Sequence, residues 1–84
     1  MTTEMIEKFI ESKNRKDNKI KIHFKERHAV TGLFIKMADY NELKSKNFWR
    51  IVNHAHIDEW KKTKNMELAR IFSGIAFTKL TDEQ

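Results

Sequence analysis

The feature that most constrains this chain is an alternating segment at residues 20–35, IKIHFKERHAVTGLFI. Ile20, Ile22 and Phe24 alternate with polar neighbours, which is the period of a strand that buries one face. Residues 30–35 are nearly all apolar around one glycine, as expected where a buried strand bends sharply. The segment therefore predicts two strands joined by a turn.

Length and composition predict one domain, residues 1–84, with its own core. The 84 residues are 39% hydrophobic and include six Phe and two Trp. A domain this small buries little surface, so association with further copies would add stability. The absence of cysteine excludes disulfides and thiolate metal sites. No apolar run is long enough to span a bilayer and residues 1–10 lack a secretory pattern, so we expect a cytoplasmic protein.

Basic residues outnumber acidic ones and gather in three parts of the sequence. The formal net charge is +5, from 17 Lys and Arg against 12 Asp and Glu. The clusters are Lys13, Arg15, Lys16, Lys19 and Lys21; Lys44, Lys46 and Arg50; and Lys61, Lys62 and Lys64. Such charge attracts polyanions by counterion release, and it also solubilises loops and sheet edges. The composition therefore admits a nucleic-acid partner without identifying one.

The first segment predicts an amphipathic helix over residues 3–13. Its N-terminus can be capped by Thr2 or Thr3. Four apolar residues then form one stripe at helical spacing, namely Met5, Ile6, Phe9 and Ile10. Such a stripe usually covers a core, so we expect this helix to pack against the sheet.

The middle of the chain predicts one further strand. Residues 38–47 are mostly polar and indicate a loop or a short helical turn. Residues 48–57, FWRIVNHAHI, are rich in aromatic and β-branched side chains, which favours a strand with Trp49 and Ile51 on one face. Residues 58–65 are charged, and we expect them to be exposed.

The last segment, residues 66–80, permits two interpretations. Its apolar spacing fits one helix, or two short strands over residues 68–72 and 76–80 that are hinged at Ser73 and Gly74. A glycine inside a helix costs about 1 kcal/mol relative to alanine. We therefore favour the two strands.

The order of helix, basic loop, strand, turn and glycine-containing strand resembles the Sm-like family, which includes the bacterial Hfq proteins. The likeness lies in KIKIHF at residues 19–24 and AVTGLFI at residues 29–35, where an apolar-polar pair precedes Gly32. The resemblance implies a strongly bent five-stranded barrel of the SH3-like kind over residues 19–80, behind the N-terminal helix. It also implies a ring of identical subunits, hence a homo-oligomer, that binds single-stranded RNA.

The second motif of that family has two counterparts in this sequence. Residues 53–57, NHAHI, resemble the Hfq segment in which Lys-His-Ala contacts RNA, with Asn53 in place of the lysine. Residues 71–74, IFSG, resemble the Arg-Gly turn before the last strand, with Ser73 in place of the nucleotide-contacting arginine. The second placement lets all five strands fit, with residues 48–52 as the third, and we prefer it.

Two histidines are candidates for chemistry beyond simple charge. His54 and His56 are two residues apart, so on a strand both side chains would leave the same face. Imidazoles so placed could share a metal with His23 or His28, or could contact phosphates. No further ligand has a definite spacing, so no metal site is predicted.

Nothing in the sequence indicates an enzyme. No pair of carboxylates is set across a cleft, no serine lies in a nucleophile-elbow context, and two glycines cannot supply a phosphate-cradling loop. No cofactor is predicted. Phe48, Trp49 and Trp60 offer base-stacking surfaces, although aromatic residues in so small a domain usually form its core.

We therefore expect a mainly β domain with an N-terminal α-helix that binds single-stranded RNA of no specified sequence and forms a homo-oligomer. The candidate nucleic-acid-binding residues are Lys44, Lys46, Arg50, His54, His56, Lys61 and Lys62. The alternative is a protein-interaction or assembly module without a nucleic-acid ligand, in which sheet edges or the N-terminal helix engage another protein.

Overall fold

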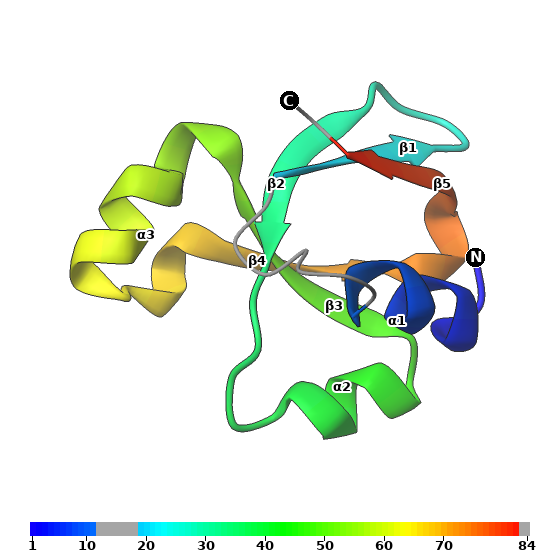
Figure 1. Ribbon diagram of the computed structural model, residues 1–84, viewed down its shortest axis with the longest axis horizontal. Coiled ribbons are helices and arrows are strands. Elements are labelled where there is room, and N and C mark those ends of the chain that lie inside the picture. The colour runs from blue at the N-terminus through cyan, green and yellow to red at the C-terminus, as the bar shows by residue number, and fades with distance from the viewer. Residues whose placement is uncertain (12–18, 83–84) are drawn as a thin grey trace.

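A five-stranded antiparallel sheet organises the computed structural model, which describes residues 1–11 and 19–82 (Figure 1). The strands are β1 (Ile20–Phe24), β2 (Val30–Phe34), β3 (Phe48–Asn53), β4 (Ala69–Ser73) and β5 (Phe77–Asp82). The helices are α1 (Thr3–Glu11), α2 (Tyr40–Ser45) and α3 (Ile57–Thr63), with short 3-10 turns η1 (His54–His56), η2 (Met66–Leu68) and η3 (Gly74–Ala76). The predicted five strands and N-terminal helix are confirmed.

β1 and β2 form the hairpin that the alternating pattern predicts. Ile20 pairs with Gly32, and the connecting loop spans residues 25–29. Gly32 has no room for a side chain, because an added Cβ would lie 2.6 Å from the carbonyl oxygen of Val52. The glycine thus lets β3 approach β2 closely where the two strands pair.

The sheet is open, with β4 and β5 as its two edges. The strand order is β4-β3-β2-β1-β5, so the last two strands lie at opposite edges although only η3 separates them in sequence (Figure 1). Within the described residues no ladder joins β4 to β5. The structure therefore shows a small mixed α/β domain, and the predicted closed barrel is not confirmed.

Apolar side chains are buried on both faces of the sheet. The inner core, to which α1 contributes, consists of Ile6, Ile20, Ile22, Trp49, Ile51, Phe77 and Leu80. The outer core, to which α3 contributes, consists of Leu33, Ile35, Val52, Ile57 and Trp60. Because successive residues of a strand point to opposite faces, β2 and β3 supply side chains to both cores.

The third strand is shorter than the sequence predicts. The side chain of Asn53 accepts a hydrogen bond from the amide of Ala55 at 3.0 Å, which caps the 3-10 turn η1. The strand predicted over residues 48–57 is therefore wrong beyond Asn53. His54 and His56 lie in η1 and do not share a strand face.

α3 occupies most of the segment that the sequence predicts to be exposed. Its charged residues do face solvent, but Ile57 and Trp60 are each only 4% exposed. Their i, i+3 spacing places both on one helix face. Lys64 ends the helix in the left-handed region, with φ at 54°, and its amide donates to the Trp60 carbonyl at 2.7 Å. Trp60 is thus a core residue and offers no base-stacking surface.

Residues 66–80 form two strands, as the interior glycine favours. A Cβ added to Gly74 would lie 2.2 Å from Oδ1 of Asn47 and 2.5 Å from Cδ1 of Ile6. The Gly74 amide also donates to the Asn47 carbonyl at 2.8 Å. The hinge between β4 and β5 requires glycine because α1 and the residue before β3 pack directly onto it.

α1 begins where the sequence predicts. Thr2 Oγ1 accepts a hydrogen bond from the Met5 amide at 3.3 Å and caps the helix. Ile6 is fully buried and Phe9 and Ile10 pack against the inner core, whereas 54% of Met5 is exposed. The end predicted near residue 13 lies outside the described residues.

Candidate nucleic-acid interface

A groove of about 1090 Å³ runs along the edge strand β4. Its basic residues are Arg27, Arg50, Arg70 and His56, and its apolar residues include Val30, Ile51, Ile71 and Phe72. No acidic residue of the described chain lines this groove. A concave basic surface without carboxylates concentrates positive potential and attracts a polyanion.

Residues from both faces of β4 line the groove. β4 is an edge strand, and β3 is its one neighbour among the described strands. Arg70 pairs with Ile51 of the inner core, so Arg70 and, two residues later, Phe72 lie on the inner face. Ile71 pairs with Arg50, and both lie on the outer face. The groove therefore offers charge on both faces and an aromatic ring on the inner one.

The three arginines differ in how far their charge is already compensated. Arg50 Nη1 lies 2.6 Å from Oδ1 of Asp39, and only 14% of the Arg50 side chain is exposed. Neither Arg27 nor Arg70 has an ion-pair partner among the residues that the structure describes, and both are exposed. Arg27 and Arg70 are therefore the cations most available to a ligand.

Arg27 lies over two aromatic rings within this groove region. Its Cζ is 5.1 Å from the ring centroid of Phe24 and 5.9 Å from that of Phe72. The two ring centroids are 5.8 Å apart. A guanidinium over an aromatic face at such distances is attracted by the ring quadrupole. This attraction holds a residue of the β1–β2 loop against β4.

Only two of the predicted binding residues, Arg50 and His56, line the groove. The others lie elsewhere on the surface: Lys44 in α2, Lys46 at its C-terminal cap, His54 in η1, and Lys61 and Lys62 in the last turn of α3. α2 precedes β3 and α3 follows it through η1, so these two helices lie well apart (Figure 1). The predicted set therefore does not form one continuous surface.

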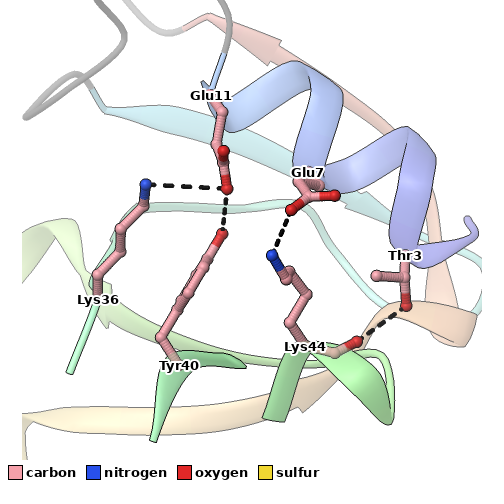
Figure 2. A network of polar contacts seen from close by, with 6 residues as sticks. All are labelled: Thr3, Glu7, Glu11, Lys36, Tyr40 and Lys44. Carbon is pink, nitrogen blue, oxygen red and sulfur yellow. Dashed lines mark hydrogen bonds and ion pairs between the residues drawn. The ribbon is translucent and has the colours of Figure 1, made fainter. Parts of the chain in front are cut away.

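Lys44 belongs to a polar network that joins α1 to α2 (Figure 2). Its ammonium group pairs with the Glu7 carboxylate, and its backbone carbonyl accepts a hydrogen bond from Thr3 Oγ1 at 3.1 Å. The Tyr40 hydroxyl donates to Glu11 at 2.8 Å. Lys44 is thus engaged in holding α1 in place.

The Tyr40 ring lies between Lys36 and Lys44, and its hydroxyl points to the Glu11 carboxylate (Figure 2). The Nζ atoms of Lys36 and Lys44 are each 5.2 Å from its ring centroid, and Lys36 Nζ is 3.8 Å from Glu11. Burial, and then the hydrogen bond to Glu11, raises the pKa of the Tyr40 hydroxyl above its ordinary value of 10.0. The hydrogen bond to Glu7 raises the pKa of Lys44. The network therefore keeps the hydroxyl neutral and the ammonium charged.

Sequence reasoning missed Arg27, Arg70 and Phe72. Arg70 and Phe72 are two residues apart in a segment already predicted as a strand, so the alternation rule could have placed both on one face. Arg27 stands in the predicted turn of the hairpin. Its proximity to β4 depends on the order of the strands, which local sequence patterns do not specify.

The four histidines are all described, and they are not grouped with the described carboxylates into a metal centre. In residues 1–11 and 19–82, no three His, Asp or Glu side chains are grouped closely enough to hold a metal ion. His54 and His56 are both exposed on η1, and only His56 reaches the groove. The same part of the chain contains no helix whose length and apolar character would let it cross a membrane.

Comparison with known proteins adds no relative to this picture. No protein-family model, no curated protein and no solved structure matches the chain. The groove beside β4, with Arg27 and Arg70 available to a ligand, is therefore the feature on which a functional assignment rests.

Proposed function

We propose that the protein binds single-stranded RNA along the groove beside β4. The observation that supports this most is that exposed Arg27 and Arg70 adjoin Phe72 in a groove that no described carboxylate lines. Arginine pairs well with phosphate, and aromatic rings stack on the bases that a single strand exposes. Neither contact selects a sequence, so binding is expected to be largely sequence-independent.

The predicted binding residues enter this proposal at two levels. Arg50 and His56 line the groove; exposed His56 would contact RNA directly, whereas Arg50, already paired with Asp39, would contribute less than Arg27 and Arg70. The exposed lysines outside the groove would add long-range attraction, namely Lys46, Lys61 and Lys62, and exposed His54 would contact a phosphate or a base at short range. Lys44 would contribute least, because Glu7 already neutralises its charge.

The first test is the salt dependence of RNA binding, measured by the fluorescence anisotropy of a short labelled RNA of mixed sequence. Phosphate contacts release counterions, so affinity falls as salt rises. Three phosphate contacts to a single strand predict a log–log slope of about −2, or roughly a 20-fold loss of affinity between 50 and 200 mM salt. No binding at low salt would overturn the proposal.

The second test compares two double variants that remove the same charge. Arg27→Gln/Arg70→Gln removes the two available arginines of the groove. The matched control, Lys21→Gln/Lys79→Gln, removes two exposed lysines from β1 and β5. The groove variant should weaken binding at least about tenfold more than the control and reduce the salt slope by about 1.4. Equal losses in both variants would show that the groove is not the site.

The proposal also includes an Sm-like barrel that assembles as a homo-oligomer in the cytoplasm. β4 and β5 are both sheet edges, and their backbone groups could pair with each other after bending or with edges of further copies. Sedimentation equilibrium tests the oligomer: a defined multimer that persists without RNA is expected. A monomer at every concentration would remove this part of the proposal and leave the groove unaffected.

A protein-interaction module is the second candidate, and one observation favours it. Ile71 on β4 and Ile75 in η3 are 51% and 66% exposed beside a strand edge that has no partner among the described strands. Exposed apolar side chains along such an edge suit the addition of a strand from another protein. Co-purification of one defined protein that survives nuclease treatment and high salt would favour this candidate over RNA binding.

A further inference from the structure

We propose that Arg27 is the middle layer of a three-layer stack, between the Phe24 and Phe72 rings below it and an unpaired RNA base above it. This inference rests on the proposed function and names the contact that would let the groove recognise bases as well as phosphates. It assigns Arg27 a role that depends on the shape of the guanidinium group and not only on its charge.

The lower layer is already built in the free protein. Arg27 Cζ lies 5.1 Å and 5.9 Å from the Phe24 and Phe72 centroids. Phe24 in turn packs edge-on against Phe77, with centroids 5.3 Å apart and planes at 87°. Phe77 is 1% exposed in the inner core. The platform beneath Arg27 is therefore anchored in the core, so little ordering is required when a base binds.

The upper layer would be supplied by the ligand. Arg27 is exposed, and in the described chain it has no carboxylate partner that would compete for its guanidinium. Guanidinium planes are established stacking surfaces for splayed bases of single-stranded RNA. A base within a duplex already has neighbours on both faces, so this contact favours a single strand.

The remaining aromatic candidates are less suited to a base. Trp49 and Trp60 are 2% and 4% exposed, so neither ring has a free face. Phe48 is 38% exposed, but it lies on the outer face of β3 and does not line the groove. Among the described aromatic residues, Phe72 is therefore the ring that the groove itself presents.

The test compares an ordinary RNA with an abasic strand of the same length and backbone charge. The wild-type protein should bind the base-bearing strand about tenfold more tightly, within the range measured for base–aromatic stacking. Arg27→Lys keeps the charge but loses the planar surface. It should abolish this preference while weakening the binding of the abasic strand much less than Arg27→Gln does, because the positive charge is kept.

Two further variants separate stacking from charge and from folding. Phe72→Leu removes one of the two rings beneath Arg27 and should also abolish the preference for the base-bearing strand. Circular dichroism would confirm that the sheet is intact. Arg70→Lys is the matched control, because Arg70 lines the same groove but lies over no ring in the described structure; it should keep the preference. A wild-type protein that binds both strands equally overturns the stacking inference and leaves the proposed function standing. A protein that binds neither strand overturns the proposed function itself.

Discussion

The side-chain oxygen of Asn47 accepts a hydrogen bond from the indole nitrogen of Trp49 at 2.8 Å. Trp49 is 2% exposed in the inner core, so its N–H depends on this partner. The side-chain nitrogen of Asn47, Nδ2, donates to the Met1 carbonyl at 2.9 Å, and the Asn47 backbone has φ at 61°. One residue thus connects the segment before α1, the core indole and, through its backbone, Gly74 of η3.

We expect Asn47→Ala to lower the free energy of unfolding by about 2–4 kcal/mol, because it leaves a buried N–H unpaired and places alanine in the left-handed region. Urea denaturation measures the change. Asn47→Gly, which accepts a positive φ but also lacks the side chain, should be about 1 kcal/mol more stable than Asn47→Ala. An alanine variant as stable as the wild type would contradict this role.

The two glycines should differ in how alanine can be accommodated. Gly32→Ala would meet the backbone of β3 and should cost at least about 2 kcal/mol, since a paired strand cannot move aside. Gly74→Ala meets the Asn47 side chain first, so combining it with Asn47→Gly should cost less than the two changes added together. Strict additivity in the second pair, measured by a double-mutant cycle, would show that the contact is not energetically coupled.

The Tyr40 hydroxyl should lose its proton at a higher pH than an ordinary tyrosine does. Tyr40 is the sole tyrosine of the chain, so tyrosinate absorbance reports it directly, and its midpoint should lie above 10.0. Because folding raises this pKa, the stabilisation from the network is fully present below pH 10.0 and is lost as pH rises through the folded pKa. The raised pKa of Lys44 acts in the same direction, from 10.5 upward.

Tyr40→Phe is the matched variant for this pH effect, because it removes the hydroxyl and keeps the ring. The difference in free energy of unfolding between the wild type and Tyr40→Phe should be constant up to about pH 10 and should shrink above it. A midpoint at the ordinary value in the folded protein would contradict both the burial of the Tyr40 hydroxyl and its hydrogen bond to Glu11.

Trp60 should behave as a core residue in both stability and binding. Trp60→Ala should cost about 3–5 kcal/mol, as expected for a buried aromatic side chain replaced by alanine. Trp60→Phe should leave RNA affinity unchanged, because this residue lies in the outer core and does not line the groove. Both tryptophans should resist acrylamide quenching; strong quenching of Trp60 would place its ring at the surface.

The parts of the fold that local patterns determine could be predicted from the sequence. The alternation through Ile20, Ile22 and Phe24 has the two-residue period of a strand and fits no helix. In the last segment, Gly74 favours two strands over one helix. Beyond Asn53 the same alternation continues by coincidence while the structure changes to a 3-10 turn and a helix. The Asn53 cap and the burial of Trp60 decide that region, and only packing reveals them.

The candidate site could be predicted less well, because it depends on contacts between distant segments. The lysine clusters of the sequence predict Lys61 and Lys62 as binding residues, but both lie on α3 outside the groove. Arg27 lies over Phe72 although β2 and β3 stand between β1 and β4 in the strand order, a contact that follows from the tertiary arrangement of the sheet. Arg27 belongs to none of the predicted basic clusters, and the apolar pattern that contains Phe72 does not indicate which distant residue lies over its ring.

The two cores also determine how the molecule should open. β2 and β3 are covered on both faces, whereas β4 and β5 each have an edge without a partner among the described strands. Amide hydrogens of β2 and β3 should therefore exchange with solvent last, and only through global unfolding. α3 contributes to the outer core alone, so its amide hydrogens should exchange through a smaller, local opening. That opening leaves the inner core intact, and with it the Phe24 and Phe72 rings beneath Arg27.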